Sequence, residues 1–219
     1  MVKSNQSMQN LNKFNHIKVH TQYSICEGAA RINDLAKFCK ENKLPSLGLS
    51  DTKNLCGALE FSENISKAGS QPIIGTQINF NFKGEIGLIP LISKNNEGYK
   101  SIIELSSKSY LDNDGLTENC CDLKDLINIG DQIIVLSGSI NGLIGKLFNK
   151  GKFKEIDEIY MILKKRYGDD FYIEIQRHGD THEKIFENFN LKKSNELDIP
   201  IIATHEVFYI TKDMHEAHD

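Results

Sequence analysis

The sequence predicts an α/β barrel, a ring of largely parallel strands covered by helices. Short apolar runs alternate with stretches of helical periodicity along the whole chain, which is the pattern of parallel strands joined by crossover helices. About seven such runs occur without a Gly-rich dinucleotide-binding loop, which favours a barrel over an open doubly wound sheet. The length of 219 residues suits one barrel domain.

The expected strands are short runs rich in aliphatic and β-branched residues. In chain order they are Ile17 to His20, Ser46 to Leu49, Pro72 to Phe80, Glu85 to Ile92, Gln132 to Leu136, Phe171 to Ile175 and Pro200 to Thr204. Helices are expected over 32–42, 55–68 and 152–167, where apolar residues recur at helical spacing. Gly69 and Gly168 follow the last two of these as stop signals. The polar stretch from about 109 to 123 is expected to be a surface excursion.

Composition narrows the class of protein. The chain has 39% hydrophobic residues, 26% charged residues and a net charge of -4, which is typical of an ordinary soluble domain. No broad basic face is evident, so the chain does not resemble an autonomous nucleic-acid binder. Five cysteines without a CxxC pair or a secretory signal indicate reduced thiols and a cytoplasmic location. No run reaches transmembrane length, so no membrane contact is expected.

Polar residues stand at or just past the expected ends of the strands. They are His20, Asp51, Gln77, Ser139, Gln176, His178, His205 and Glu206. Because the carboxyl ends of barrel strands meet at one rim, these side chains would converge there. Positions near loops are often polar in any protein. This pattern alone therefore favours a functional site and a rim of ordinary solvent-facing polar residues equally.

Five stretches of the sequence are distinctive when taken together. They are HIKVHTQYSICEGAARINDL, LGLSDTKNLCGALEFSENISKAGSQPIIGTQI, SKNNEGYKSIIELSSKSY, FYIEIQRHG and IPIIATHEVFYI. Together they resemble one family, the amino-terminal PHP (polymerase and histidinol phosphatase) domain of bacterial DNA polymerase III alpha subunits. The resemblance covers nearly the whole chain from about Phe14. It implies a PHP-type distorted (β/α)7 TIM-like barrel over 15–210, a flexible lead-in at 1–14 and, at 211–219, the start of a linker or helix into a polymerase region.

The resemblance also implies a function. The parent protein would be a DNA-directed DNA polymerase, a nucleotidyltransferase acting in DNA replication with Mg²⁺, whose catalytic residues lie outside this chain. The domain itself would be an inactive scaffold that supports the polymerase core and docks the proofreading 3'-5' exonuclease subunit. Other polymerase III holoenzyme subunits and the primer-template DNA would be reached through the rest of the parent chain. Two alternatives are an active metal-dependent PHP phosphoesterase or 3'-5' exonuclease, and a free-standing interaction module.

Metal-using members of the superfamily carry a cluster of His, Asp, Glu and Cys ligands, and this sequence keeps only part of it. Lys18 stands where the first His of a His-x-His pair would be, and Thr52 where a His would follow Asp51. Gln77 replaces a Glu, Ser139 replaces a sulfur or imidazole ligand, and Phe208 replaces the final His. The vestigial cluster expected from the resemblance is Lys18, His20, Asp51, Gln77, Ser139, His178, His205 and Glu206.

An ammonium a few ångströms from a divalent ion costs several kcal/mol in a partly desolvated site, so no metal is expected here. If one did bind, His20, Asp51 and His178 would be its ligands. We expect Lys18 to supply the positive charge instead, by pairing with Asp51 and, as a second candidate, Glu206. His205 is kept open as a ligand of a shifted site.

The remaining histidines have structural interpretations. His16 lies at the start of its strand, away from the rim, and is expected to have a hydrogen-bonded structural role. His178 and His182 have the i, i+4 spacing of a helical metal pair, but Gly179 and Asp180 between them favour a turn and a helix cap.

Overall fold

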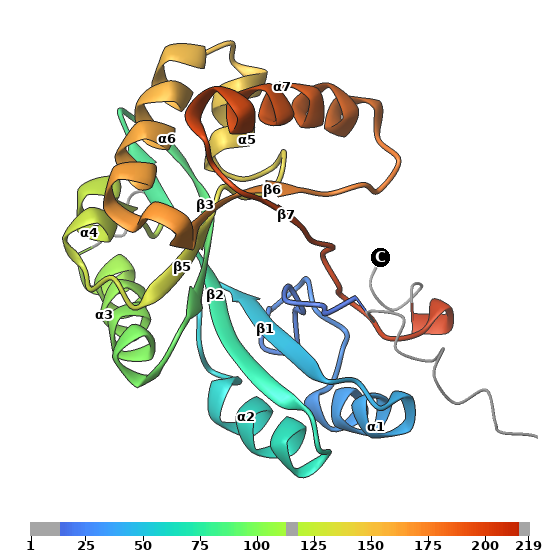
Figure 1. Cartoon of the computed structure of the whole chain (residues 1–219). Helices are drawn as coiled ribbons and strands as arrows, with labels where there is room; N and C mark the ends of the chain where they lie inside the picture. The colour runs from blue at the N-terminus through green and yellow to red at the C-terminus, as the bar shows by residue number, and fades with distance from the viewer. Residues whose placement is uncertain (1–13, 113–117, 215–219) are drawn as a thin grey trace, which may run out of the picture.

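The structure is a computed structural model and describes residues 14–112 and 118–214. Within these residues, one sheet contains six strands in the order β1-β2-β3-β5-β6-β7, and a short strand, β4, pairs with β2 beside this row. The strands are β1 (Ser46–Thr52), β2 (Gln71–Phe82), β3 (Glu85–Ser93), β4 (Cys121–Asp122), β5 (Ile133–Leu136), β6 (Phe171–Ile175) and β7 (Ile201–Ala203). The sheet curls, and the helices surround it on the outside (Figure 1).

Seven α-helices lie within the described residues. They are α1 (Ile32–Asn42), α2 (Ala58–Lys67), α3 (Asn96–Leu111), α4 (Leu123–Asn128), α5 (Leu143–Asn149), α6 (Phe153–Tyr167) and α7 (Thr181–Leu197). The three helices expected from periodicity are confirmed as α1, α2 and α6. The expected surface excursion is partly wrong, because α3 continues to Leu111 and β4 and α4 occupy its other end; residues 113–117 lie outside the described residues.

The prediction of a largely parallel sheet holds for four pairs, since β2 is parallel to both β1 and β4, and β6 is parallel to both β5 and β7. β3 is the exception and is antiparallel to both β2 and β5. Its reversal has a local cause, because Lys83 and Gly84 alone join β2 to β3. Both residues have positive φ, 53° and 83°, which is the conformation of a two-residue hairpin turn.

The predicted strand at Ile17 to His20 is an extended segment that closes the ring, and we call residues 16–20 the closing segment. Val19 bridges Leu49 of β1 on one side and Val207, beyond β7, on the other. The Val19 amide donates to the Gly48 carbonyl (3.0 Å), and the His20 amide donates to the Val207 carbonyl (2.8 Å). Gly48 permits this approach, because a Cβ there would lie 2.5 Å from the Ile17 Cα. Backbone hydrogen bonds of the closing segment therefore link the two ends of the curled sheet.

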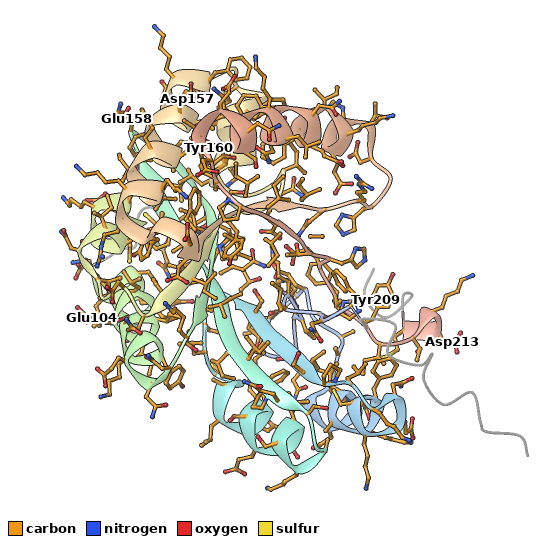
Figure 2. The ribbon with its side chains drawn as sticks, in the orientation of Figure 1. Glu104, Asp157, Glu158, Tyr160, Tyr209 and Asp213 are labelled. Carbon is orange, nitrogen blue, oxygen red and sulfur yellow. The ribbon has the colours of Figure 1, made fainter. Side chains whose placement is uncertain are left out.

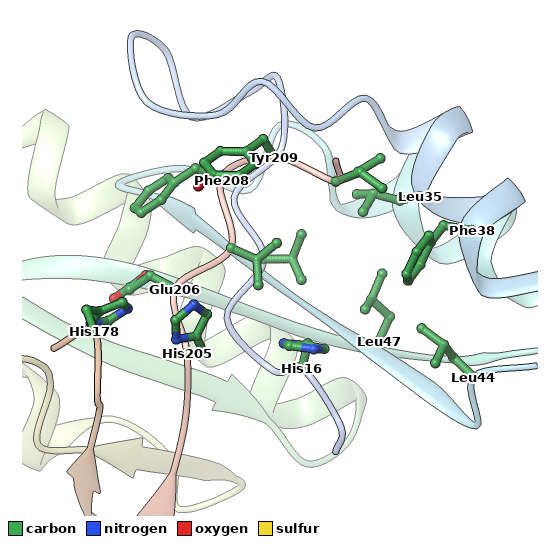
Figure 3. A pocket seen from close by; sticks show the side chains of 13 residues that line it. His16, Leu35, Phe38, Leu44, Leu47, His178, His205, Glu206, Phe208 and Tyr209 are labelled. Atoms are coloured by element: carbon green, nitrogen blue, oxygen red, sulfur yellow. The ribbon is translucent and has the colours of Figure 1, made fainter. Parts of the chain in front are cut away.

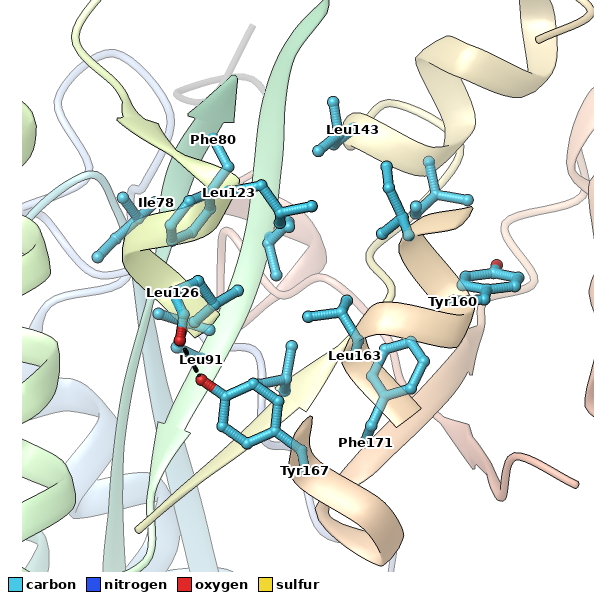
Figure 4. Packing of buried hydrophobic residues seen from close by; sticks show 14 of the residues in the cluster. Ile78, Phe80, Leu91, Leu123, Leu126, Leu143, Tyr160, Leu163, Tyr167 and Phe171 are labelled. Carbon is cyan, nitrogen blue, oxygen red and sulfur yellow. Dashed lines mark hydrogen bonds between the residues drawn. The ribbon is translucent and has the colours of Figure 1, made fainter. Parts of the chain in front are cut away.

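Two hydrophobic clusters hold the helices against the sheet. The larger one packs α6 on β5 and β6 through side chains such as Leu163 and Phe171, and the Tyr167 hydroxyl donates to the Leu126 carbonyl within it (Figure 4). Tyr160, labelled in Figure 2, is fully buried on the same helix. The smaller cluster lies under α1 and α2 around Phe61. These clusters fix the strands whose ends carry the polar rim.

The ends of the chain lie largely outside the described residues. Of the expected lead-in at 1–14 only Phe14 is described, and of the expected linker at 211–219 only residues 211–214 are described, including the short 3-10 turn Lys212–Met214. In the part of the chain that is described, no helix is both long and apolar enough to cross a membrane.

Candidate functional site

Polar side chains from several elements meet inside the barrel, near the carboxyl ends of the parallel strands. The closing segment contributes Lys18 and His20, β2 contributes Gln77, β6 and the residue after it contribute Glu174 and Gln176, and the chain beyond β7 contributes Thr204 and Glu206. Apart from Glu206, each of these residues is buried in the protein. Their geometry decides whether they could hold metal ions.

Lys18 lies at the centre of this group and is 1% exposed. Its Nζ is 2.9 Å from Glu174 Oε1 and 2.5 Å from Glu206 Oε1. Burial alone would lower the pKa of Lys18, but the two carboxylates more than offset this and raise the pKa above its ordinary value. The predicted partner Glu206 is therefore in place, while Glu174 is a partner that the sequence analysis missed.

Asp51 does not pair with Lys18, so that expectation is wrong. The Asp51 carboxylate is fully buried and accepts from the Thr21 amide (2.6 Å), the Thr21 hydroxyl (2.8 Å) and the Ser24 hydroxyl (2.7 Å). Its acceptor sites are used by the turn that follows the closing segment. Neutral donors at this distance satisfy a buried carboxylate without a cation, so Asp51 fixes the turn instead.

His20 and Glu206 form the second contact of the cluster. His20 Nε2 is hydrogen-bonded to Glu206 Oε2, and Gln77 Nε2 donates to the same carboxylate oxygen at 3.2 Å. The Phe208 ring stacks on His20 with centroids 4.4 Å apart. Burial would raise the pKa of Glu206, but Lys18 and His20 outweigh it and hold the pKa well below its usual range. Glu206 is therefore an anion that joins the closing segment to β2.

Glu174 is held by donors on one oxygen. Its Oε1 accepts from Gln176 Nε2 (2.7 Å) and from the Thr204 hydroxyl, in addition to Lys18. Its backbone amide donates to the Ser137 hydroxyl at 2.9 Å. The sequence does carry a signal for this residue, because Glu174 is the charged residue in the otherwise apolar run FYIEI and faces inward there.

A cavity of about 430 Å³ lies above the cluster and collects most of the predicted rim. Of the residues predicted at the strand ends, it is lined by His20, Gln77, Ser139, Gln176, His178 and Glu206. Asp51 lies behind it and is connected through Ser24, whose hydroxyl is 3.4 Å from His20 Nδ1.

His205 instead lines a neighbouring cavity of about 490 Å³, with His178 and His16 (Figure 3). The His178 and His205 rings lie 4.4 Å apart, and His178 Nδ1 contacts Glu183 Oε1 at 2.6 Å. Burial and the neighbouring His178 lower the pKa of His205. The pair therefore packs together beside the Lys18 cluster.

Two other histidine expectations are decided by the structure. His16 Nδ1 is buried and has no hydrogen-bond partner among the described residues, so the expected hydrogen-bonded role is wrong; its ring packs edge-on against Phe14 instead. The cap before α7 is confirmed, because the Asp180 side chain accepts from the His182 amide at 2.8 Å.

The residues present do not fit a cluster of divalent metals. The Lys18 ammonium lies between the two central carboxylates, where a metal would meet direct charge repulsion. Of the three ligands expected if a metal did bind, Asp51 is used by Thr21 and Ser24, and His178 faces His205 and Glu183. In the described ranges, no group of three or more His, Cys, Asp or Glu residues could hold a metal ion.

Comparison with known proteins places the chain in a family. A family model described as "PHP domain" matches residues 16–178. The chain is 31% identical over 210 residues to the DNA polymerase III subunit alpha of Vibrio cholerae and 34% identical over 214 residues to that of Caulobacter vibrioides. Each match covers 94% of this chain but only 18% and 19% of the relatives, so the chain spans about a fifth of their length.

Solved structures share the fold at low sequence identity. A protein from Bifidobacterium adolescentis described as a metal-dependent phosphoesterase has a TM-score of 0.58 at 10% identity, covering 89% of this chain and 87% of that one. An amidohydrolase from Chromobacterium violaceum has a TM-score of 0.57 at 7% identity, covering 92% of this chain and 89% of that one. These likenesses concern the fold alone, and the family match agrees with them. The chain belongs to the PHP domain family.

Proposed function

We propose that this chain is the PHP domain of a DNA polymerase III alpha subunit and acts in DNA replication, in the cytoplasm, as a catalytically inactive scaffold. The similarity to two polymerase III alpha subunits supports the parent protein. The observation that carries the scaffold role is the position of Lys18 Nζ, within 2.9 Å of Glu174 and 2.5 Å of Glu206. Lys18 thus supplies the charge that metal ions supply in metal-using members of the superfamily.

The contacts of the cluster support a scaffold role because they join elements that are distant in sequence. Lys18 and His20 tie the closing segment to Glu206 beyond β7, and Lys18 also ties it to Glu174 in β6. Gln77 adds β2 to the same carboxylate. Side-chain bonds thus cross the centre of the barrel between elements far apart in sequence. We therefore expect these buried, hydrogen-bonded ion pairs to favour this one arrangement of the chain.

The lining of the 430 Å³ cavity argues against a phosphoesterase that binds its substrate without metal ions. Its described lining residues include Glu27, Glu183 and Glu206 but no Lys or Arg. A phosphoester is anionic and is bound in proteins by cations or by metal ions. Lys18 cannot serve, since it is buried beneath the cavity and engaged with two carboxylates.

The proposal assigns partners to the domain and to its parent. The domain would support the polymerase core and dock the proofreading 3'-5' exonuclease subunit. DNA-directed polymerisation, Mg²⁺, the primer-template and the other holoenzyme subunits would belong to the rest of the parent chain. The test of the parent activity is nucleotide incorporation by the full-length gene product, with capture of the exonuclease subunit by the same protein.

The scaffold role is tested by metal content and hydrolysis. The purified chain is incubated with Zn²⁺ or Mn²⁺, dialysed and examined by elemental analysis, and then assayed for release of nucleotides from 3'-labelled DNA. We expect substoichiometric metal and no release. Stoichiometric metal, with Mn²⁺-dependent release that His20→Ala abolishes and the exposed-site control His182→Ala retains, would instead establish an active phosphoesterase or exonuclease.

A further inference from the structure

Two buried polar atoms near the Lys18 cluster have no hydrogen-bond partner among the described residues. They are Glu174 Oε2 and Asn190 Nδ2. Glu174 is 2% exposed, and Asn190, on α7, is fully buried. A buried donor or acceptor without a partner is destabilising, and native proteins satisfy nearly all such atoms with protein groups or ordered water. A single bound molecule could satisfy both of these unpartnered atoms if they lie beside the same cavity.

Both residues line the same small cavity. It has a volume of about 10 Å³ and is also lined by Ser139, Gln176 and Phe186. A polar cavity needs about 10 to 15 Å³ of this kind to hold one water molecule. The space is thus close to the size of a single water and too small for an organic ligand.

Hydrogen-bond directions define what the occupant must do. The Tyr160 hydroxyl donates to Asn190 Oδ1 at 2.8 Å, which fixes the orientation of the amide. Among the described residues, Asn190 Nδ2 is then the donor left without a partner, Glu174 Oε2 is the acceptor left without one, and both residues line the cavity. The occupant must accept one hydrogen bond and donate another. A bare cation cannot accept, and an anion would be repelled by Glu174.

We propose that one internal water molecule binds between Glu174 Oε2 and Asn190 Nδ2 and connects α7 to the Lys18 ion pairs. The connection runs from Tyr160 through Asn190 and the water to Glu174, whose other oxygen contacts Lys18. The small cavity shares Ser139, Ile140, Gln176 and Glu183 with the 430 Å³ cavity, so the water exchanges with solvent from that side. This site does not depend on the assignment of the parent polymerase.

The unmodified chain provides the first test. In a high-resolution crystal structure we expect one peak about 2.7 to 3.2 Å from both Glu174 Oε2 and Asn190 Nδ2. In solution, the Asn190 side-chain amide protons should show a cross-relaxation signal with water that reports a long-lived bound molecule. An empty density map or a missing signal would overturn the proposal. Crystals soaked in Tl⁺ that show an anomalous peak there would also overturn it in favour of a cation.

Variants give the second test. Asn190→Leu removes the donor and fills the cavity, so the density peak should disappear. The control Asn188→Leu makes the same change at an exposed position of α7 and should leave the peak in place. If Asn190→Leu retains the peak at the same position, the donor is not part of the site and the proposal is wrong. If that variant does not fold, the cross-relaxation signal of the unmodified chain still decides the outcome.

Discussion

Replacing Lys18 with Met gives the sharpest test of the charge arrangement in the barrel. The change keeps most of the buried aliphatic volume but removes an ammonium that contacts Glu174 at 2.9 Å and Glu206 at 2.5 Å. At an effective dielectric constant of about 20, each contact represents roughly 6 kcal/mol of attraction, set against several kcal/mol for desolvating each ion. Because two carboxylates stay buried and lose their cation, we expect the free energy of unfolding to fall by about 3 to 5 kcal/mol.

Thermal and urea unfolding followed by circular dichroism measure this loss. For a domain of this size, 1 kcal/mol corresponds to about 2 to 4 °C, so the midpoint should fall by roughly 6 to 20 °C. Lys100→Met is the matched control, because Lys100 contacts Glu97 at a similar 2.8 Å while 71% exposed. An exposed ion pair contributes little to stability, so this variant should melt close to the unmodified chain.

Two further measurements separate the loss of charge from the loss of packing. Adding Glu174→Gln and Glu206→Gln to Lys18→Met removes the unpaired charges and should recover part of the stability. The single Lys18 variant should also lose less stability at pH 5 than at pH 8, because unpaired buried carboxylates bind protons more readily than unfolded ones. If Lys18→Met melts like Lys100→Met and shows no such pH dependence, the ammonium is not the cation that holds this cluster.

Three other outcomes follow from the contacts described above. Burial lowers the pKa of both His16 and His205, so the unfolded chain binds more protons than the folded one. Urea titrations should therefore show the free energy of unfolding falling as the pH drops from 7 through these lowered pKa values. His205→Phe should reduce the slope of this pH dependence. Asp51→Asn places an amide donor against a donor of Thr21 or Ser24, so the free energy of unfolding in the same titrations should fall by about 1 to 3 kcal/mol. An unchanged free energy of unfolding would mean that the buried carboxylate does not hold the turn. Gly48→Ala should displace the closing segment and increase hydrogen exchange at the Val19 amide; unchanged exchange would contradict the close packing at Ile17.

Much of the fold could be predicted from the sequence because it is encoded in local patterns. Apolar runs marked the strands β1, β2, β3, β5, β6 and β7, and periodicity marked α1, α2 and α6. The reversed direction of β3 was encoded only in the two-residue turn at Lys83 and Gly84, and β4 is too short to show periodicity. Pattern methods report neither pairing direction nor two-residue strands well.

The site could be predicted only in part. Sequence position brought Lys18, His20, Gln77 and Glu206 to one place, because each stands near the barrel rim. The partner of Lys18 could not be settled this way, since Asp51 and Glu174 both lie in or at the end of inward-facing strands. The choice depends on the turn at Thr21 and Ser24, whose donors satisfy Asp51 and leave Glu174 as the available carboxylate. Such competition between donors is decided in three dimensions.

The way the ring closes has a consequence for the order of events during synthesis. His20 and Glu206 are 186 residues apart in sequence, and the closing segment has its second neighbouring strand only beyond β7. During synthesis, one edge of the closing segment therefore stays unpaired until the residues beyond β7 have been translated. Contacts this distant slow folding and expose an edge that other chains can pair with. We therefore expect the newly made chain to be prone to aggregation until the residues around Val207 are present.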